Sequence, residues 1–352
     1  MNFAAKLIRW QQFHGRHHLP WQNTRDPYAI WLSEIMLQQT QVITVIPYYL
    51  RFLQRFPDIS SLALAPLDEV LALWSGLGYY ARGRNLHQAA QLIVSHHGGE
   101  FPRDLAAIQQ LPGIGRSTAA AIAAFAYGEH CAILDGNVKR VFARCFGIDG
   151  YPGERKTETL LWQMAEQLLP RKKIQGQIES YTQALMDLGA TICTRSKPQC
   201  AACPLQPDCV AFREKRIDKL PIAKPRKPLP QKETVLLLLL WRGKILLEKR
   251  PPTGIWGGLW CLPEIPLGEN ATTYCARHFG LKVQPLTELP PINHGFTHFK
   301  LRIHPQPLQV VAHTLIARES GAVWLTFEDA LEAAIPTPVR KRLLPIYNRE
   351  CL

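Results

Sequence analysis

Four cysteines stand close together in the stretch CTRSKPQCAACPLQPDC, which spans residues 193 to 209. Their spacing is Cys-x6-Cys-x2-Cys-x5-Cys, formed by Cys193, Cys200, Cys203 and Cys209. Four thiolates in one short loop suit a tetrahedral zinc ion or a [4Fe–4S] cluster, and the spacing differs from that of the usual paired zinc knuckles. The other cysteines are scattered. Because no secretory leader is recognised, we expect a reducing compartment and free or metal-bound thiols.

Two acidic residues could carry proton chemistry, and the first is Glu34 in DPYAIWLSEIMLQQTQ. Apolar neighbours disfavour a charged carboxylate, so Glu34 could serve as a general acid near neutral pH. A lone Glu on a helix is more often an ordinary exposed residue. Helical spacing places it on one face with these residues: Ile30, Trp31, Leu37, Gln38 and Gln41.

The second acidic residue is Asp135 in AILDGNVKRVFARC, where it follows an apolar stretch and precedes a predicted helix. By itself this position is typical of a helix N-cap. Backbone N–H groups and the helix dipole keep such a carboxylate ionised. An ionised carboxylate can stabilise a sugar cation that develops beside it. The capping role and the chemical role are therefore compatible.

The stretch LPGIGRSTAAAIAAFAYG, residues 111 to 128, places a Pro-Gly-x-Gly turn between two helical patterns. Glycines permit positive φ, and the turn amides with the next helix N-terminus can bind one phosphate. The stretch resembles the helix-hairpin-helix motif, although a plain helix–helix turn has the same outline. We expect DNA contacts from Leu111, Gly113, Gly115, Arg116 and Ser117.

These residues need elements to position them, and composition divides the chain of 352 residues into two parts. Residues 1–212 show helical patterns joined by short Pro/Gly turns, with Asp26 and Pro27 beginning one helix. Residues 212–233 carry eight basic residues and four prolines, which is typical of a linker or an exposed loop. The run TVLLLLLWRGKILLEKR after it predicts a β-hairpin. Further strands are predicted from HFKLRIHP and VAHTLIA, and a final helix is predicted from PVRKRLLPIYN.

The net charge of +13, from 41 basic and 28 acidic residues, favours a polyanionic partner. No apolar run approaches the ~18 residues that a membrane span needs. We therefore expect a nucleic-acid partner and no membrane partner.

The stretches WLSEIMLQQTQV, GLGYYARGRNLH, LPGIGRSTA, LDGNVKRV and the four-cysteine run occur in the order found in MutY-type adenine DNA glycosylases. The resemblance implies an all-α helix-hairpin-helix core with a [4Fe–4S] cluster on the four cysteines. It implies that Glu34 protonates adenine, that Asp135 stabilises the oxocarbenium-like sugar, and that Asn137 orients the sugar or water. It further implies that Gln39 and Tyr79 enter the DNA helix near the partner base.

The same resemblance implies an adenine pocket with Trp31 and Gln183 in its wall. The family often shows Phe-Asn-Gln where this chain has Tyr181-Thr182-Gln183, which leaves the role of Thr182 open. The related endonuclease III carries a nucleophilic lysine at the position of Ser117. Since serine lacks the amine, the resemblance implies a glycosylase without efficient strand cleavage.

RPPTGIWGGLWCLPE resembles the Nudix-like C-terminal domain of the same family. The stretch PLGENATTYCARHFGL has one Glu where a Nudix hydrolase has several Mg²⁺-binding acids, so nucleotide hydrolysis is not expected. The loop HGFTHF carries Phe296, Thr297 and His298 where the family commonly has Phe-Ser-His, which contacts 8-oxoguanine.

The sequence therefore predicts a helical DNA glycosylase domain (1–212), a basic linker (213–233) and a small α/β or α+β Nudix-like recognition domain (234–352). The expected activity is removal of adenine mispaired with 8-oxoguanine or guanine in double-stranded DNA, by a monomer in the cytoplasm, associated with the nucleoid. The alternatives are an endonuclease III-like lyase, a catalytically silent mismatch-binding protein and a nucleotide pyrophosphatase. Ser117 argues against the lyase. The presence of both Glu34 and Asp135 argues against the silent binding protein, and the missing Nudix acids argue against the pyrophosphatase.

Overall fold

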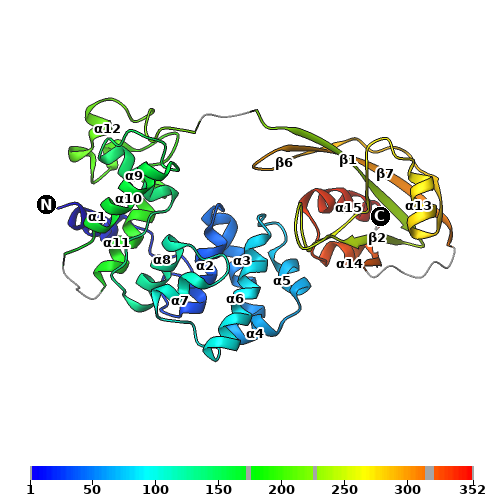
Figure 1. The fold of residues 1–352 in the computed structure, drawn as a ribbon, viewed down its shortest axis with the longest axis horizontal. Coiled ribbons are helices and arrows are strands. Elements are labelled where there is room, and N and C mark those ends of the chain that lie inside the picture. Colours follow the sequence, from blue (N-terminus) through cyan, green and yellow to red (C-terminus); the bar gives the residue numbers. More distant parts are fainter. Residues whose placement is uncertain (1, 172–175, 225–227, 314–320, 351–352) are drawn as a thin grey trace. The chain divides into compact units, whose positions relative to one another are not determined.

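A computed structural model of the chain describes residues 2–171, 176–224, 228–313 and 321–350. The chain divides into two compact units, which we call the helical unit (Met1–Leu64 and Asn85–Arg226) and the sheet unit (Ala65–Arg84 and Lys227–Leu352). No helix in the described ranges is long and apolar enough to cross a membrane. Figure 1 shows helices alone in the first unit and a sheet with helices in the second.

The helical unit contains the helices that the sequence predicts, and its described residues form no strand. In chain order its helices are α1 (Phe3–His14), α2 (Pro27–Leu37), α3 (Val42–Arg55), α4 (Ile59–Leu64), α6 (Ala81–His97), α7 (Leu105–Gln110), α8 (Arg116–Tyr127), α9 (Gly136–Cys145), α10 (Arg155–Gln167), α11 (Gln177–Asp187), η1 (Leu188–Ile192), η2 (Cys200–Ala202), η3 (Gln206–Asp208) and α12 (Val210–Arg213). Helix α6 belongs to this unit from Asn85 onward.

Helix α2 begins as the sequence predicts, with the Asp26 side chain accepting a hydrogen bond from Tyr28 N and Pro27 in the first turn. Its buried residues occupy every side of the helix, so α2 is a central helix that packs against α3 and α8. The alanines of α8 are buried, and their small side chains permit this close approach. A central, closely packed helix gives Glu34 a rigid base.

The N-terminal helix α1 docks on the core through Leu7 and Trp10. These side chains join a buried cluster with residues of α8, α9, α10 and α11. His14, one helical turn after Trp10, is exposed. The cluster fixes α9, the helix that follows Asp135, against α11, the helix that carries Gln183.

The sheet unit is built on one mixed sheet of order β3-β2-β1-β7-β5, in which β4 pairs with β1, β6 with β7 and β8 with β2. Of the strands that the structure describes, only β1 and β7 run parallel to each other. Figure 1 shows α13 on one side of the sheet and α14 and α15 on the other. The elements are α5 (Leu67–Trp74), β1 (Gln231–Trp241), β2 (Lys244–Lys249), β3 (Trp260–Cys261), β4 (Glu264–Ile265), α13 (Ala271–Phe279), β5 (Leu281–Pro285), β6 (Ile292–Gly295), β7 (Lys300–His313), β8 (Ala322–Thr326), α14 (Phe327–Glu332) and α15 (Thr337–Glu350).

Strand β1 is the central strand, which explains its nearly continuous leucines, because both of its faces are covered. The predicted hairpin joins it to β2 through Arg242 and Gly243, with φ of 49° and 72°. Two consecutive positive φ values give the turn that matches the twist of a hairpin. The final helix is also confirmed. The strand predicted from VAHTLIA is described only as far as His313, and its remainder lies outside the described residues.

Part of the basic stretch predicted as a linker is packed. Leu220 is buried, and its carbonyl accepts a hydrogen bond of 2.8 Å from Arg144 Nε. Strand β1 already begins at Gln231. The predicted boundaries at 212 and 234 stay a prediction, but the chain beyond 212 contributes to the core of the helical unit.

Candidate active site and metal-binding loop

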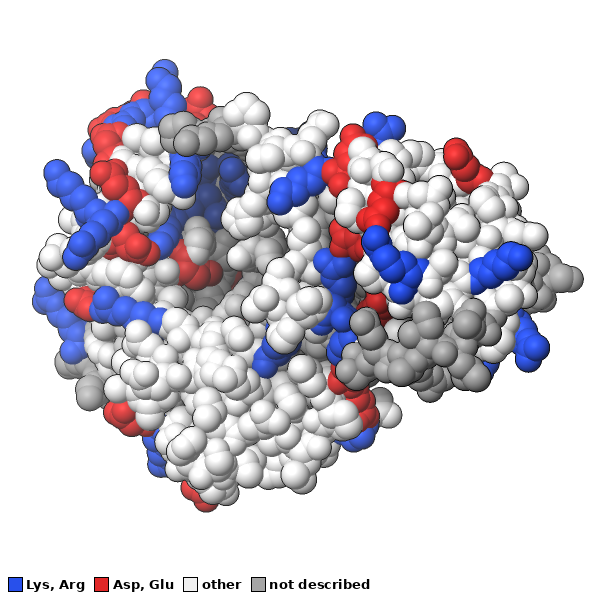
Figure 2. All heavy atoms as spheres, turned by 45° about the vertical axis from the view of Figure 1, so that its right-hand side comes forward, with Lys and Arg blue, Asp and Glu red and all other residues white. Residues whose placement is uncertain are grey.

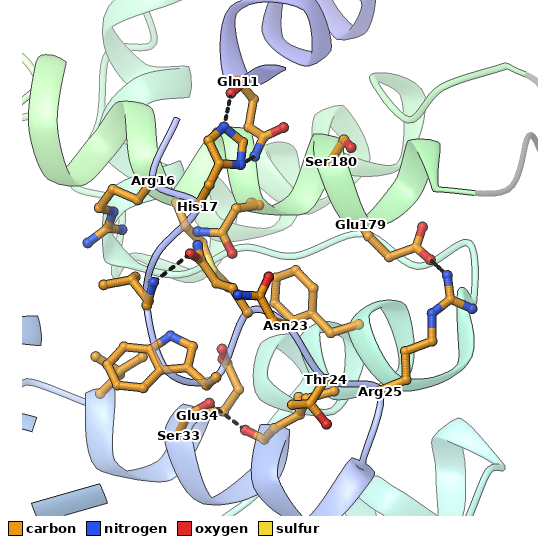
Figure 3. Close-up of a pocket in the computed structure, with 18 of the residues that line it drawn as sticks. Gln11, Arg16, His17, Asn23, Thr24, Arg25, Ser33, Glu34, Glu179 and Ser180 are labelled. Atoms are coloured by element: carbon orange, nitrogen blue, oxygen red, sulfur yellow. Dashed lines mark hydrogen bonds and ion pairs between the residues drawn. The ribbon is translucent and has the colours of Figure 1, made fainter. Parts of the chain in front are cut away.

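The helical unit contains a pocket of about 530 Å³, within the usual range for small-molecule sites. The loop between α1 and α2, together with α2 and α11, supplies most of its wall (Figure 3). Lys and Arg side chains gather around a hollow in the helical part on the face shown in Figure 2. The residues that line the pocket include Arg16, His17, Leu19, Trp21, Gln22, Arg25, Ile30, Ser33, Glu34, Leu37, Phe125, Glu179, Ser180 and Gln183.

Glu34 projects from α2 into this pocket (Figure 3). Burial raises the pKa of its carboxyl group to about 8, and the nearby charge of Asp135 adds to the rise. A carboxyl with this pKa holds its proton at neutral pH, which is what a general acid requires. The sequence prediction that apolar neighbours disfavour its charged form agrees with this environment.

Asp135 is the N-cap of α9, and its Oδ1 accepts a hydrogen bond of 2.8 Å from Val138 N. Burial raises the pKa of Asp135, while the N–H groups of Val138 and Asn137 and the charge of Arg140 act to lower it. The sequence shows only the effects that lower this pKa, because burial is not visible in it. Because these stabilise the charge on Asp135, we expect Asp135 to ionise before Glu34 in this interacting pair.

Three polar contacts hold the start of α9 in place. Ser117 Oγ accepts a hydrogen bond of 2.9 Å from Leu134 N, directly before Asp135. Asn137 Oδ1 accepts one of 2.9 Å from Arg140, whose guanidinium also donates to the carbonyl of Gly189 at 2.6 Å. These contacts restrict the position of Asp135 and the orientation of the Asn137 amide.

Helix α11 brings a second polar group to the pocket. Gln183 Nε2 donates to Asp187 Oδ1 at 2.9 Å, and the same carboxylate is paired with Arg16 at 2.6 Å. One turn earlier, Glu179 Oε1 lies 3.2 Å from Arg25 (Figure 3). These contacts tie the loop between α1 and α2 to α11, and so they close the pocket on one side.

The predicted hairpin joins α7 to α8. Gly113 has a φ of 81°, and Asn85 lies 3.0 Å from the point that a Cβ would occupy, so this position requires glycine. Gly115 is the N-cap of α8, and open space surrounds it. The Arg116 guanidinium lies 3.8 Å from the centre of the Trp162 ring and pairs with Glu166. An open helix N-terminus with a flanking arginine suits a phosphate.

One small pocket is lined by all four cysteines of the loop: Cys193, Cys200, Cys203 and Cys209. Arg144 lies beside them and is almost fully buried. It donates to the carbonyls of Thr194 at 2.7 Å and Arg195 at 3.0 Å, and to Cys193 Sγ at 3.5 Å. Among the described residues, no three His, Cys, Asp or Glu side chains are arranged to hold a single metal ion.

In the sheet unit, residues 296–299 form the turn between β6 and β7, closed by a 2.9 Å hydrogen bond from Phe296 N to Phe299 O. The rings of Phe296 and Phe299 stack with centres 4.5 Å apart, below the exposed tip of Thr297 and His298. The Tyr79 hydroxyl lies 3.4 Å from Thr297 Oγ1. Tyr79 is half exposed with a φ of 47°, so it is not a core residue.

Comparison with known proteins identifies the family. The model described as HhH-GPD superfamily base excision DNA repair protein matches residues 32–167, and the NUDIX domain model matches residues 234–344. The adenine DNA glycosylase of Buchnera aphidicola subsp. Baizongia pistaciae is 36% identical over 345 residues, covering 98% of this chain and 96% of the relative. The chain belongs to the adenine DNA glycosylase family.

Solved structures agree with this family fold. A thermostable thymine-DNA glycosylase is 30% identical, with a TM-score of 0.54 over 60% of this chain and 95% of that one. A non-covalent endonuclease III–DNA complex is 20% identical, with a TM-score of 0.51 over 60% of this chain and 94% of that one. At that identity the second likeness concerns the fold alone.

Two residues expected at functional surfaces of this adenine DNA glycosylase family member are buried instead. Trp31 is fully buried against Tyr28 and Phe101, so it lies behind the pocket and not in its wall. Leu111 is buried at the end of α7, so its side chain does not reach the surface of the hairpin. Gln39, by contrast, is exposed with a φ of 56° just after α2.

The loop between α1 and α2, which supplies much of the pocket wall, was not predicted from the sequence. Leu19 and Trp21 line the pocket from this loop, and the Trp21 ring packs on Tyr49 with centres 5.3 Å apart. The apolar triplet LPW inside the otherwise polar stretch GRHHLPWQNTRD is the signal that could have identified it. Apolar side chains in a polar loop mark a segment that packs on something.

Proposed function

We propose that this chain removes adenine mispaired with 8-oxoguanine or guanine from double-stranded DNA, without efficient strand cleavage. The observation that carries the proposal is the pair formed by Glu34, a carboxyl with a pKa of about 8, and the N-cap carboxylate Asp135 beside it. An acid next to a charge-stabilising carboxylate is the arrangement that glycosidic-bond hydrolysis uses.

In the proposed reaction Glu34 donates its proton to a ring nitrogen of adenine, which becomes a better leaving group. As the bond between base and sugar breaks, positive charge develops on the sugar, and Asp135 stabilises that charge. Water then adds to the sugar, and Asn137 contributes to its orientation. The target adenine must leave the base stack before it can enter the pocket.

The absence of an amine at position 117 supports a reaction that stops after base release. Strand cleavage requires an amine that attacks the sugar and forms a Schiff base, and Ser117 has only a hydroxyl, bound to Leu134 N. Lys139, one turn into α9, pairs with Glu158 at 2.5 Å. That ion pair engages the Lys139 amine with a carboxylate of α10.

DNA contact is proposed for the hairpin, with Gly113, Gly115, Arg116 and the first turn of α8 at one phosphate. Gln39 and Tyr79 fit the role of residues that enter the duplex, because both side chains are exposed and both residues have a positive φ. The turn 296–299 is the proposed reader of 8-oxoguanine, with Thr297 and His298 as its polar tip.

The cofactor proposed for the cysteine loop is a [4Fe–4S] cluster on Cys193, Cys200, Cys203 and Cys209. The fit rests on four thiols around one pocket and on Arg144, which donates toward Cys193 Sγ and holds the loop carbonyls. Such a cluster supplies a rigid, covalently bonded support for the loop. Arg195 and Lys197 between the first two cysteines would lie along the DNA backbone.

A single-turnover assay tests the proposed function on duplexes with adenine opposite 8-oxoguanine, guanine or thymine, and on one with an oxidised pyrimidine. Each sample is split and analysed with and without alkali. We expect breaks at the first two duplexes, mainly after alkali. Asp135→Asn should lose adenine release and keep folding and DNA binding.

Breaks at the oxidised pyrimidine without alkali would assign the chain to the endonuclease III type of activity. Tight mismatch binding without base release, in protein that carries its full iron content, would support a binding protein without catalysis. Full activity of Asp135→Asn would refute the role of that residue.

A further inference from the structure

The amide of Gln183 has a fixed orientation in the pocket wall. Its Nε2 donates to Asp187 Oδ1 at 2.9 Å. A carboxylate accepts hydrogen bonds and donates none, so the opposite orientation would set two acceptors against each other. The contact therefore turns Gln183 Oε1, an acceptor, away from Asp187.

Asp187 is itself held firmly. Its side chain is fully buried, and it accepts hydrogen bonds from Arg16 N at 2.9 Å and Arg16 Nε at 2.7 Å. Arg16 belongs to the loop between α1 and α2, 171 residues away in the chain. Buried charge with this many partners is rigid, because each broken contact would leave a polar group unpaired. The orientation of Gln183 is thus built into the fold.

We propose that Asp187 is a positioning residue that selects 6-amino purines over 6-oxo purines by presenting Gln183 Oε1 to the base. Adenine carries an N–H donor at C6, whereas hypoxanthine and guanine carry an acceptor there. The inference rests on the proposed function, because it names how the same pocket chooses its base. A polar group fixed in one orientation rejects the wrong partner more strongly than apolar contacts do.

The substitution Asp187→Leu tests the proposal because it keeps the approximate size of the side chain and removes the acceptor that holds Gln183 Nε2. The Gln183 amide is then free to turn Nε2 toward the base. Asp187→Asn is unsuitable, because Arg16 Nε donates to the same Oδ1 and would keep an amide oxygen facing Gln183. Base release is measured in single turnover for adenine and for hypoxanthine, each opposite 8-oxoguanine. We expect the ratio of the adenine rate constant to the hypoxanthine rate constant to fall at least about tenfold. A merely structural role would lower both rate constants and leave the ratio unchanged.

A second variant keeps the test decisive if Asp187→Leu does not fold. Gln183→Met fills a similar space and offers no strong acceptor, so it should lower the same ratio by a similar factor. In the Gln183→Met background, Asp187→Leu should change the ratio no further. An unchanged ratio in folded Asp187→Leu or in Gln183→Met would overturn the proposal.

The wild-type measurement separates this inference from the proposed function. Wild-type protein that releases adenine while both variants keep the wild-type ratio refutes the role of Asp187 alone. Wild-type protein that releases no adenine refutes the proposed function and this inference together.

Discussion

The hydroxyl oxygen of Ser117, on the first turn of α8, accepts a 2.9 Å hydrogen bond from the amide of Leu134. Leu134 directly precedes Asp135, so the hairpin helix and the proposed catalytic carboxylate share one contact. The hydroxyl satisfies a backbone N–H of a buried residue that belongs to no helix or strand. Ser117 therefore has a structural task besides the DNA contact expected from the sequence.

We predict that Ser117→Ala destabilises the protein by about 1–3 kcal/mol, because Leu134 N loses its acceptor. The rate constant for adenine release should fall several-fold, since the start of α9 is less restrained, while DNA affinity changes little. Urea denaturation and single-turnover kinetics measure the two effects. Ser95→Ala is the matched control: the Ser95 hydroxyl is exposed and binds carbonyls of its own helix, so about 0.5 kcal/mol or less is expected. Equal effects of the two substitutions would contradict the assignment.

The pKa of Glu34 predicts the alkaline limb of the reaction. Adenine release that needs the protonated carboxyl should be constant well below pH 8 and should approach a fall of about tenfold per pH unit well above it. The limb belongs to the interacting pair of Glu34 and Asp135, not to one residue. Single-turnover rate constants between pH 6 and pH 10 measure it, and a flat profile across that range would rule out Glu34 as the acid.

Glu34 also makes stability depend on pH. Its pKa rises from 4.5 to about 8 on folding, so the native state holds a proton that the unfolded chain releases in that window. The associated stability is full below pH 4.5 and is lost as the pH rises through 8. Glu34→Gln does not titrate, so its advantage over the wild type should grow across that window, by about 2–5 kcal/mol. Urea denaturation at pH 5, 7 and 9 measures this difference, and a constant difference would be evidence against it.

Arg144→Met should prevent the four-cysteine loop from binding its proposed iron–sulfur cluster stably. The substitution leaves the carbonyls of Thr194, Arg195 and Leu220 without their buried donor, at a cost of about 3 kcal/mol or more. Iron content per chain and the visible absorbance of purified protein report the effect independently of activity. Arg144→Met protein with its full iron content and wild-type stability would contradict the role of Arg144 in holding the loop.

The exposed Arg195 of the same loop provides the matched comparison. Arg195→Met should keep its iron and its stability and should weaken binding to all duplexes alike. If Arg195 contacts one phosphate, the slope of log K against log salt should become shallower by about 1. An unchanged slope would exclude Arg195 from the DNA interface.

Thr297→Val removes a hydroxyl from the tip of the turn 296–299 and preserves its shape. Since Thr297 is exposed and its contact with the Tyr79 hydroxyl is long, at 3.4 Å, the melting temperature should change little. The affinity ratio between 8-oxoguanine and guanine duplexes should fall about fivefold, the value of one hydrogen bond. Thr297→Ser retains the hydroxyl and should retain the ratio. Equal ratios in wild type and Thr297→Val would exclude this hydroxyl from lesion recognition.

Local rules predicted the elements that local chemistry determines. The cap at Asp26, the helix after Asp135 and the turn at Arg242 and Gly243 each depend on a few neighbouring residues. The structure has all three. The resemblance placed Trp31 in the pocket wall, but α2 is buried on every side, so its sequence pattern cannot separate residues of the pocket from residues of the core.

The remaining part of the site depends on contacts between distant segments. Arg16 meets Asp187 across 171 residues, and Ser117 meets Leu134 between two helices. Neither pair has a pattern in the sequence that marks it, because each contact follows from how the helices pack. The raised pKa of Asp135 was not predictable from the sequence either. The sequence shows that Asp135 caps a helix, but it does not show that the carboxyl is buried.

The turn 296–299 joins two strands whose pairing continues on either side of it, and the Phe296–Phe299 stack closes it from below. Apart from the 3.4 Å contact of Thr297 Oγ1 with the Tyr79 hydroxyl, its two exposed tip residues therefore contribute little to the fold. If the turn reads the partner base as proposed, substitutions at positions 297 and 298 can change which partner base is preferred at little cost in stability. The Thr at position 297, where the resemblance implies Ser, is then a change of this kind.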